Sequence, residues 1–97
     1  YSDRLAEKRR PALVVSHPDL AKRSGRVWVA MITSVEVNGM GDASLADLIS
    51  AGLPTASFLR ASKLATLDVD RVIRVAGRLS ERDEQAARRA LMACSGF

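Results

Sequence analysis

The chain has 97 residues, with 15 lysines and arginines against 11 aspartates and glutamates, which gives a formal net charge of +4. This length suits one domain over residues 1–97, and a domain this small cannot enclose a large cavity, so a surface groove is the expected place for function. No apolar run approaches the roughly 20 residues of a membrane span and no apolar signal segment follows the charged start, which favours a cytoplasmic protein.

The composition narrows the chemistry further. Cys94 is the only cysteine and His17 the only histidine, so one chain can form neither an internal disulfide nor a Cys/His zinc site. Any chemistry must rely on other residues, and we expect no metal and no cofactor. The basic balance favours an anionic partner, such as nucleic acid or an acidic protein tail. Aromatic residues make up only 4% of the chain, so recognition should depend on arginine and hydrogen bonding more than on stacking.

The first third of the chain predicts a loop and two strands. Residues 1–10 are polar and irregular. Pro11 then introduces a short strand over Ala12–Ser16, which ends at His17–Pro18. A turn is expected before Arg26–Ile32, the strongest predicted strand, because it is β-branched and apolar on both faces.

The middle of the chain predicts little regular structure. Val35–Pro54 contains glycines that indicate a mobile loop. Within it, Ser44 as a helix N-cap, Asp47 at the capping-box position and Gly52 as a stop predict one or two helical turns.

The last third predicts two more strands and a helix. Ser57–Leu64 and Val72–Leu79 have strand patterns, separated by the tight turn LDVDR. The capping box Ser80–Asp83 starts a C-terminal helix. Its expected inner face consists of small or apolar residues at helical spacing: Ala87, Ala90, Leu91 and Cys94. Four or five strands followed by one helix indicate an α+β domain with a strongly coiled antiparallel sheet.

Three features could carry chemistry: Arg9–Arg10 before the proline, Thr33–Ser34 after the best strand, and Lys63. RNA cleavage without a metal needs a deprotonated 2'-hydroxyl, stabilisation of the charge on phosphorus, and a proton for the leaving oxygen. A single imidazole excludes a two-histidine ribonuclease within one chain. Arginine can bind phosphate through its planar fork, and a hydroxyl fixed at a strand end can donate to a phosphate oxygen.

Simpler interpretations stay open on these residues. Arg9–Arg10 also fits a solvated charge cluster. Thr33–Ser34 also fits the polar end of a strand, and Lys63 an edge-strand lysine that discourages aggregation. Cys94 has apolar neighbours and no histidine nearby, so we interpret it as a small hydrophobic residue.

Five segments taken together resemble the PemK/MazF family of toxin endoribonucleases, the mRNA interferases of type II toxin–antitoxin systems. In order they are RRPALVVS (9–16), MITS (31–34), AGLPTAS (51–57), KLATLD (63–68) and GRLS (77–80). The resemblance covers nearly the whole chain. It implies a small SH3-like antiparallel β-barrel with a C-terminal helix, a homodimer, and metal-independent, sequence-specific cleavage of single-stranded RNA such as mRNA. It also implies an antitoxin whose acidic, partly disordered tail occupies the RNA groove.

The resemblance assigns roles residue by residue. Arg10 matches the arginine before the family's proline, and Thr33 matches the threonine of its strand-end motif. The family uses these two as its catalytic pair, so Arg10 is expected to handle proton transfer and phosphate charge while Thr33 binds the scissile phosphate. Ser34 and Arg9 are expected to contact the RNA, and Lys63 belongs to a strand that the family associates with RNA contacts.

The chain departs from the family in two places. A "GD" strand normally precedes the loop that Tyr1–Asp3 continues, and this strand is absent from the sequence. Either a further segment precedes Tyr1, or the first strand is lost and the sheet has an exposed edge. Lys63 replaces a glutamine that many members carry, which affects the expected target sequence. Two alternative functions remain from the sequence: a gyrase-poisoning toxin of the same superfamily, and a non-catalytic module that binds RNA or a partner.

Overall fold

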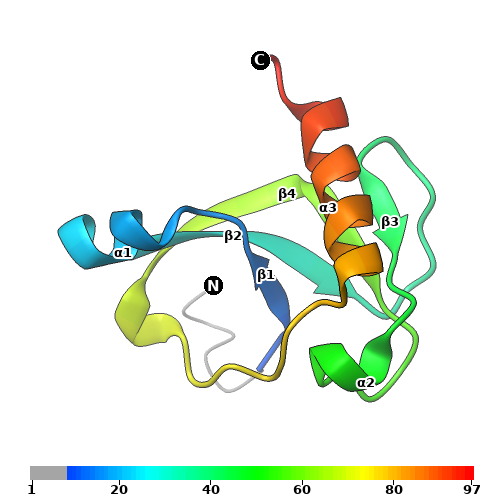
Figure 1. The fold of residues 1–97 in the computed structure, drawn as a ribbon, viewed down its shortest axis with the longest axis horizontal. Helices are drawn as coiled ribbons and strands as arrows, with labels where there is room; N and C mark the ends of the chain where they lie inside the picture. Colours follow the sequence, from blue (N-terminus) through cyan, green and yellow to red (C-terminus); the bar gives the residue numbers. More distant parts are fainter. Residues whose placement is uncertain (1–8) are drawn as a thin grey trace.

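A curled, four-stranded antiparallel sheet forms the centre of the molecule over residues 9–97, the part that this computed structural model describes (Figure 1). The strand order is β1-β2-β4-β3, so β1 and β3 are the two edges of a half-barrel. The strands are β1 (Ala12–Val14), β2 (Arg26–Thr33), β3 (Asp42–Ser44) and β4 (Phe58–Asp68). The helices are α1 (Pro18–Ser24), α2 (Leu48–Ala51) and α3 (Glu81–Cys94), with a 3-10 turn at Val69–Arg71.

The curl has its origin in an irregularity of the longest strand. Along β2, the pairing with β4 keeps one register as far as Ala30, which is opposite Leu64. The next residue of β2, Met31, is opposite Arg60, so the register shifts at this step. Residues 61–63 are therefore extra on the β4 side of the ladder. Extra residues on one strand bend it and increase its twist, which lets one long strand serve both halves of the sheet.

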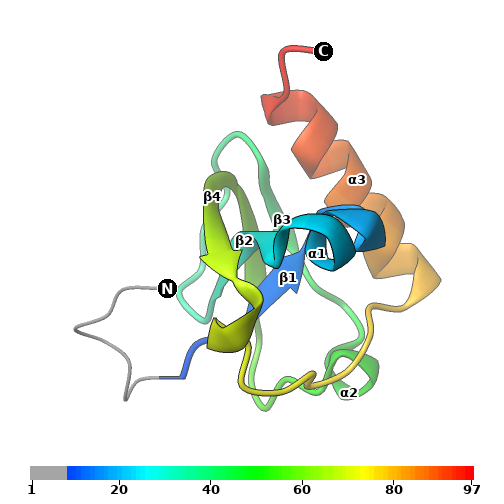
Figure 2. The same ribbon diagram turned by 90° about the vertical axis from the view of Figure 1, so that its left-hand side faces the viewer.

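The C-terminal helix covers one face of this sheet. Figure 2 shows α3 on one side of the strands. Ala87 of α3 is buried against Ala30 of β2 and Leu59 of β4, and Leu45 completes this core cluster. The helix is positioned by Ser80, whose hydroxyl oxygen accepts a hydrogen bond from the Asp83 backbone N–H (3.2 Å). The predicted C-terminal helix, its cap and the buried positions Ala87 and Ala90 are thus confirmed.

Cys94 lies on the inner face of α3 as predicted, toward Gly41 and Ala61, but it is not buried. Its side chain is exposed, because the last turn of the helix extends past the main core. The thiol lies close to Gly41, where an added Cβ would come within 2.2 Å of Sγ. Gly41 also has a φ of +82°, so both the backbone and this contact require glycine there.

A turn was predicted between the first two strands, and the structure has helix α1 there. His17 caps it, because its Nδ1 accepts a hydrogen bond from the Asp19 N–H (3.1 Å). Pro18 occupies the first turn, where a missing N–H costs nothing. Gly25 ends the helix with a φ of +73°. Start and stop signals were therefore present, but seven residues are too few to show a helical period.

The region predicted as a loop contains β3 and α2. Ser44 ends β3 and does not cap a helix. Asp47 is the N-cap of α2, accepting hydrogen bonds from the Ser50 N–H (3.0 Å) and hydroxyl (2.7 Å). The backbone N–H of Ser50 first, and its hydroxyl second, hold the pKa of Asp47 below its ordinary value.

Two predictions about the later strands need correction. The strand predicted over Ser57–Leu64 continues to Asp68 as β4, so LDVDR is a strand end followed by a 3-10 turn. The prediction of a strand over Val72–Leu79 is wrong, since this segment has no regular secondary structure and does not join the sheet. It packs against the end of α2 instead, where the Arg78 N–H donates to the Ser50 carbonyl (2.9 Å). Residues 1–8, including the expected loop and Tyr1–Asp3, lie outside the described part.

Candidate functional site

The backbone register brings two of the predicted site residues opposite each other. β1 and β2 pair with Ala12 across from Met31. The Ile32 N–H donates to the Pro11 carbonyl (3.3 Å), so the pairing continues beyond β1. Continued by one more residue, this register places Arg10 opposite Thr33. Opposed residues of an antiparallel pair have Cα atoms roughly 4.5–5.5 Å apart and side chains on the same face.

The Thr33 hydroxyl is oriented by its own turn. Its oxygen accepts a hydrogen bond from the Val35 N–H (3.1 Å), and the residue is half-buried at the end of β2. A hydroxyl that accepts in this way still has its hydrogen to donate. Thr33 therefore has the geometry of a donor held at a fixed strand end, beside an exposed arginine.

The row of side chains continues onto the other half of the sheet. Thr33 is paired with Phe58 of β4, and Phe58 with Ser44 of β3. Phe58 is half-buried while its neighbour Leu59 is fully buried, so the two point to opposite faces. One row on a single face of the sheet thus contains Arg10, Thr33, Phe58 and Ser44. Leu59 points to the other face, and that other face is the one that α3 covers.

The next row on the same face contains an ion pair. Met31 of β2 is opposite Arg60 of β4, and Arg60 is opposite Asp42 of β3. Arg60 Nε lies 3.3 Å from Asp42 Oδ1, with the two side chains 31% and 2% exposed. The other carboxylate oxygen accepts from the Gly39 N–H (2.7 Å). Asp42 is therefore fixed on both sides, and it holds an arginine whose outer part reaches solvent.

The remaining predicted residues lie around this row at different distances. Ser34 follows Thr33 and is exposed, and Arg9 precedes Arg10 and is exposed. Lys63 is exposed in the extra stretch of β4, beside the Ala30–Met31 step of β2. At about 3.4 Å per residue, this places Lys63 roughly 7–10 Å along the sheet from the Thr33 row. The register brings Arg10 and Thr33 together and leaves Lys63 to one side.

Sequence reasoning missed Phe58, Arg60 and Asp42. The available signal was the alternation in SFLRAS, where an aromatic residue and an arginine take turns with the buried Leu59 and Ala61. Only the register shows that these two side chains share a face with Thr33.

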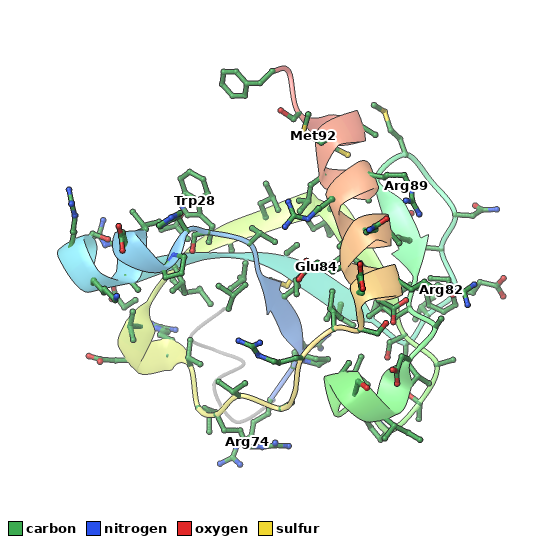
Figure 3. The ribbon with its side chains drawn as sticks, in the orientation of Figure 1. Trp28, Arg74, Arg82, Glu84, Arg89 and Met92 are labelled. Carbon is green, nitrogen blue, oxygen red and sulfur yellow. The ribbon has the colours of Figure 1, made fainter. Side chains whose placement is uncertain are left out.

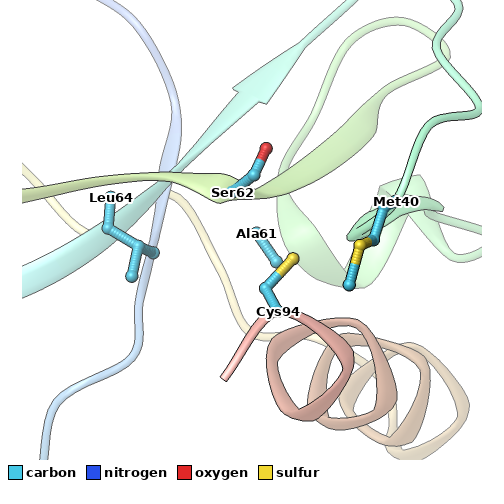
Figure 4. A pocket seen from close by; sticks show the side chains of 5 residues that line it. All are labelled: Met40, Ala61, Ser62, Leu64 and Cys94. Atoms are coloured by element: carbon cyan, nitrogen blue, oxygen red, sulfur yellow. The ribbon is translucent and has the colours of Figure 1, made fainter. Parts of the chain in front are cut away.

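An open depression of about 340 Å³ lies elsewhere, between the last turn of α3 and the bend in β4 (Figure 4). Its lining is uncharged: Met40, Ala61, Ser62, Leu64 and Cys94. The outer side of α3 presents Arg82, Glu84 and Arg89, and Trp28 projects from β2 near α1 (Figure 3). None of these features lies in the Arg10–Thr33 row.

A curled antiparallel sheet with a C-terminal helix is also present in solved structures of bacterial toxins, such as the Mycobacterium tuberculosis toxin MazF-mt6. A family profile of PemK-like, MazF-like toxins of type II toxin–antitoxin systems matches residues 2–94, so the chain belongs to that family. The match spans nearly the whole chain and confirms the family expected from the sequence. A search of curated protein sequences found no match.

Solved structures agree with this fold. The Mycobacterium tuberculosis toxin MazF-mt6 is 24% identical, with a TM-score of 0.75 over 88% of this chain and 84% of its own. A mycobacterial endoribonuclease in complex with its cognate antitoxin is 18% identical, with a TM-score of 0.80 over 91% and 82%. A MazE–MazF complex from Deinococcus radiodurans is 19% identical, with a TM-score of 0.78 over 95% and 86%.

Proposed function

We propose that this toxin is a metal-independent endoribonuclease that cleaves single-stranded RNA in a sequence-specific way, with Arg10 and Thr33 as its catalytic pair. The observation that carries the proposal is the β1–β2 register, which continues through the Pro11–Ile32 hydrogen bond toward Arg10 and Thr33. Membership in the toxin family supports it, as do similar structures described as endoribonucleases.

The chemistry follows from the two side chains. The 2'-oxygen of the RNA attacks the adjacent phosphorus, the bond from phosphorus to the 5'-oxygen breaks, and the 2'-proton is removed while the leaving 5'-oxygen gains one. Arg10 stabilises the charge on the phosphoryl oxygens and takes part in proton transfer, and the Thr33 hydroxyl donates to a phosphate oxygen. The products are a 2',3'-cyclic phosphate and a 5'-hydroxyl. Arg9, Ser34 and Lys63 bind the flanking backbone.

The test is cleavage of a long single-stranded RNA in EDTA. The native chain should give discrete fragments with 5'-hydroxyl ends, and DNA of the same sequence should stay intact. Arg10→Ala should lower the cleavage rate by about 10²–10³-fold, as loss of a transition-state charge partner does, and Thr33→Val should follow it while Thr33→Ser retains activity.

Arg23→Ala is the matched control, because Arg23 is an exposed arginine on α1, outside the site. It should cleave like the native chain. Intact RNA after incubation with folded native protein would contradict the proposal. A supercoiling assay run in parallel would then show whether gyrase is the target instead.

Two partners belong to the same proposal. An antitoxin segment with acidic and apolar residues fits the arginines around Thr33, and its affinity should fall as salt is added. A second copy of the chain is expected because the buried core is small while Trp28 and Leu64 remain 53% and 58% exposed. Sedimentation at micromolar concentration should give the mass of a dimer, and a monomer there would count against it.

A further inference from the structure

Beyond the catalytic pair, we propose that Phe58 and Arg60 of β4 form a nucleotide subsite in which Phe58 stacks on one base of a single-stranded RNA and Arg60 contacts the neighbouring phosphate. The inference rests on the proposed function for the class of its ligand. It gives these two residues a role in binding and none in breaking the bond.

The first argument is the place of Phe58. It is directly opposite Thr33 in the β2–β4 ladder, so the two Cβ atoms are roughly 5 Å apart and the ring is beside the hydroxyl that would hold the scissile phosphate. It is half-buried and is not among the side chains packed against the main core. Trp28 is two residues from Ala30 on β2, so its side chain is on the same face as Ala30, which is the face that α3 covers. Within residues 9–97, Phe58 is the aromatic residue on the same face as Thr33.

The second argument is the preorganisation of Arg60. It lies two residues from Phe58 on the same face, a separation of about 7 Å along a strand. The Asp42 carboxylate holds it at 3.3 Å and is itself 2% exposed and bound to the Gly39 N–H. An arginine already held in place loses less rotamer freedom when a phosphate binds. A ring and a fixed cation at this spacing suit one base and one phosphate of the same strand.

Binding can be measured separately from cleavage. The probe is a labelled pool of random single-stranded oligonucleotides with 2'-fluoro in place of every 2'-hydroxyl, which cannot undergo the attack. By fluorescence anisotropy, Phe58→Leu should weaken binding about tenfold or more, the usual range for loss of one base stack, while Phe58→Trp retains affinity. Phe97→Leu is the matched control, because Phe97 is an exposed aromatic residue beyond the end of α3, and it should bind within about twofold of the native chain.

The Arg60 half of the subsite has a different signature. Arg60→Gln should weaken binding more at low salt than at high salt, and Arg60→Lys should recover part of the loss. The loss in Phe58→Leu should be nearly the same at both salt concentrations, since stacking involves no net charge.

A second measurement keeps the test valid if Phe58→Leu folds poorly. The tightest oligonucleotide from the pool is remade with a single abasic nucleotide at each position in turn. One position should weaken binding to the native chain and to Phe58→Trp about tenfold, because both rings stack there, and should have little further effect on Phe58→Leu, as coupled partners do. If every abasic position is tolerated by the native chain, no base is stacked and the proposal is overturned.

The outcomes separate this proposal from the proposed function. Cleavage by the native chain together with unchanged binding in Phe58→Leu would overturn the subsite alone. Weaker binding in Phe58→Leu together with no cleavage would support the subsite and overturn the nuclease. If a peptide of glutamate and leucine loses affinity in Phe58→Leu while the pool does not, the surface is a peptide site and the RNA subsite is overturned.

Discussion

Within residues 9–97, Asp83 is the most completely buried charged residue, at 1% exposure in the first turn of α3. Its two carboxylate oxygens accept hydrogen bonds from the backbone N–H groups of Ala46 (2.9 and 3.1 Å) and Asp47 (2.8 Å). In the capping box predicted from the sequence, this side chain would turn back to Ser80. It instead ties the start of α3 to the start of α2, which is a tertiary contact no local pattern reveals.

We expect Asp83→Ala to lower the free energy of unfolding by about 2–4 kcal/mol, because it leaves two part-buried donors without their carboxylate. Asp83→Asn should cost less, since its amide oxygen can still accept one of the bonds. Urea unfolding with an unchanged m-value measures both.

Glu84→Ala is the control for Asp83→Ala. Glu84 is the next residue on the same turn, is exposed, and pairs with Arg88 at 3.5 Å. Removing an exposed pair of this kind and one first-turn charge should cost under about 1 kcal/mol. Equal losses in the Asp83 and Glu84 variants would show that the buried carboxylate contributes no more than surface charge.

Because local patterns do not reveal tertiary contacts, only some of the site residues could be predicted from the sequence. Arg10 and Thr33 stand beside strand punctuation and in motifs shared with a family, so they are visible along the chain. Phe58 and Arg60 gain their meaning from residues on β2 and β3 far from them in sequence. Their pairing depends on the register shift in β4, and nothing in the letters of 57–64 specifies how many residues that shift contains.

At the scale of elements, the segment predicted as a strand over Val72–Leu79 shows how tertiary packing overrides a local pattern. Its apolar alternation is real, but the segment lies against the end of α2. A Cβ at Gly52 would meet the Ala76 carbonyl oxygen at 2.1 Å, and one at Gly77 would meet the Ser50 carbonyl oxygen at 2.3 Å. Two glycines thus permit a close backbone crossing, and that crossing takes the place of a ladder.

Gly52→Ala and Gly25→Ala test this crossing as a matched pair. Both glycines end helices with φ near +72° to +73°, so alanine should cost each about 1–2 kcal/mol of left-handed strain. Nothing lies within 4 Å of an added Cβ at Gly25, whereas at Gly52 the Ala76 backbone must move. We expect Gly52→Ala to lose a further 1–3 kcal/mol or so, the usual cost of overpacking. If both variants lose the same free energy of unfolding in urea, the backbone around Ala76 moves away from the added Cβ at no cost.

At the scale of the whole molecule, the positive charge is unevenly distributed. α3 carries three arginines and three carboxylates, so the helix face is close to neutral. No described helix is long and apolar enough to cross a membrane. The face opposite α3 has Arg10 and Arg60 near Thr33, Arg9 precedes Arg10 and is exposed, and Lys63 lies in the extra stretch of β4. These cations are the ones available to the proposed RNA strand on the sheet side.

Lys63→Gln tests how far along the sheet an RNA strand extends. Each cation that neutralises a phosphate of a single strand contributes about −0.7 to the slope of log K against log salt concentration. If the strand passes from the Thr33 row to the extra stretch of β4, Lys63→Gln should make the slope less steep by about 0.7, and Arg88→Gln on α3 should leave it unchanged. The slope is measured with the 2'-fluoro pool. An unchanged slope in Lys63→Gln would place Lys63 outside the RNA path and leave it the role of a lysine that protects the bent strand from aggregation.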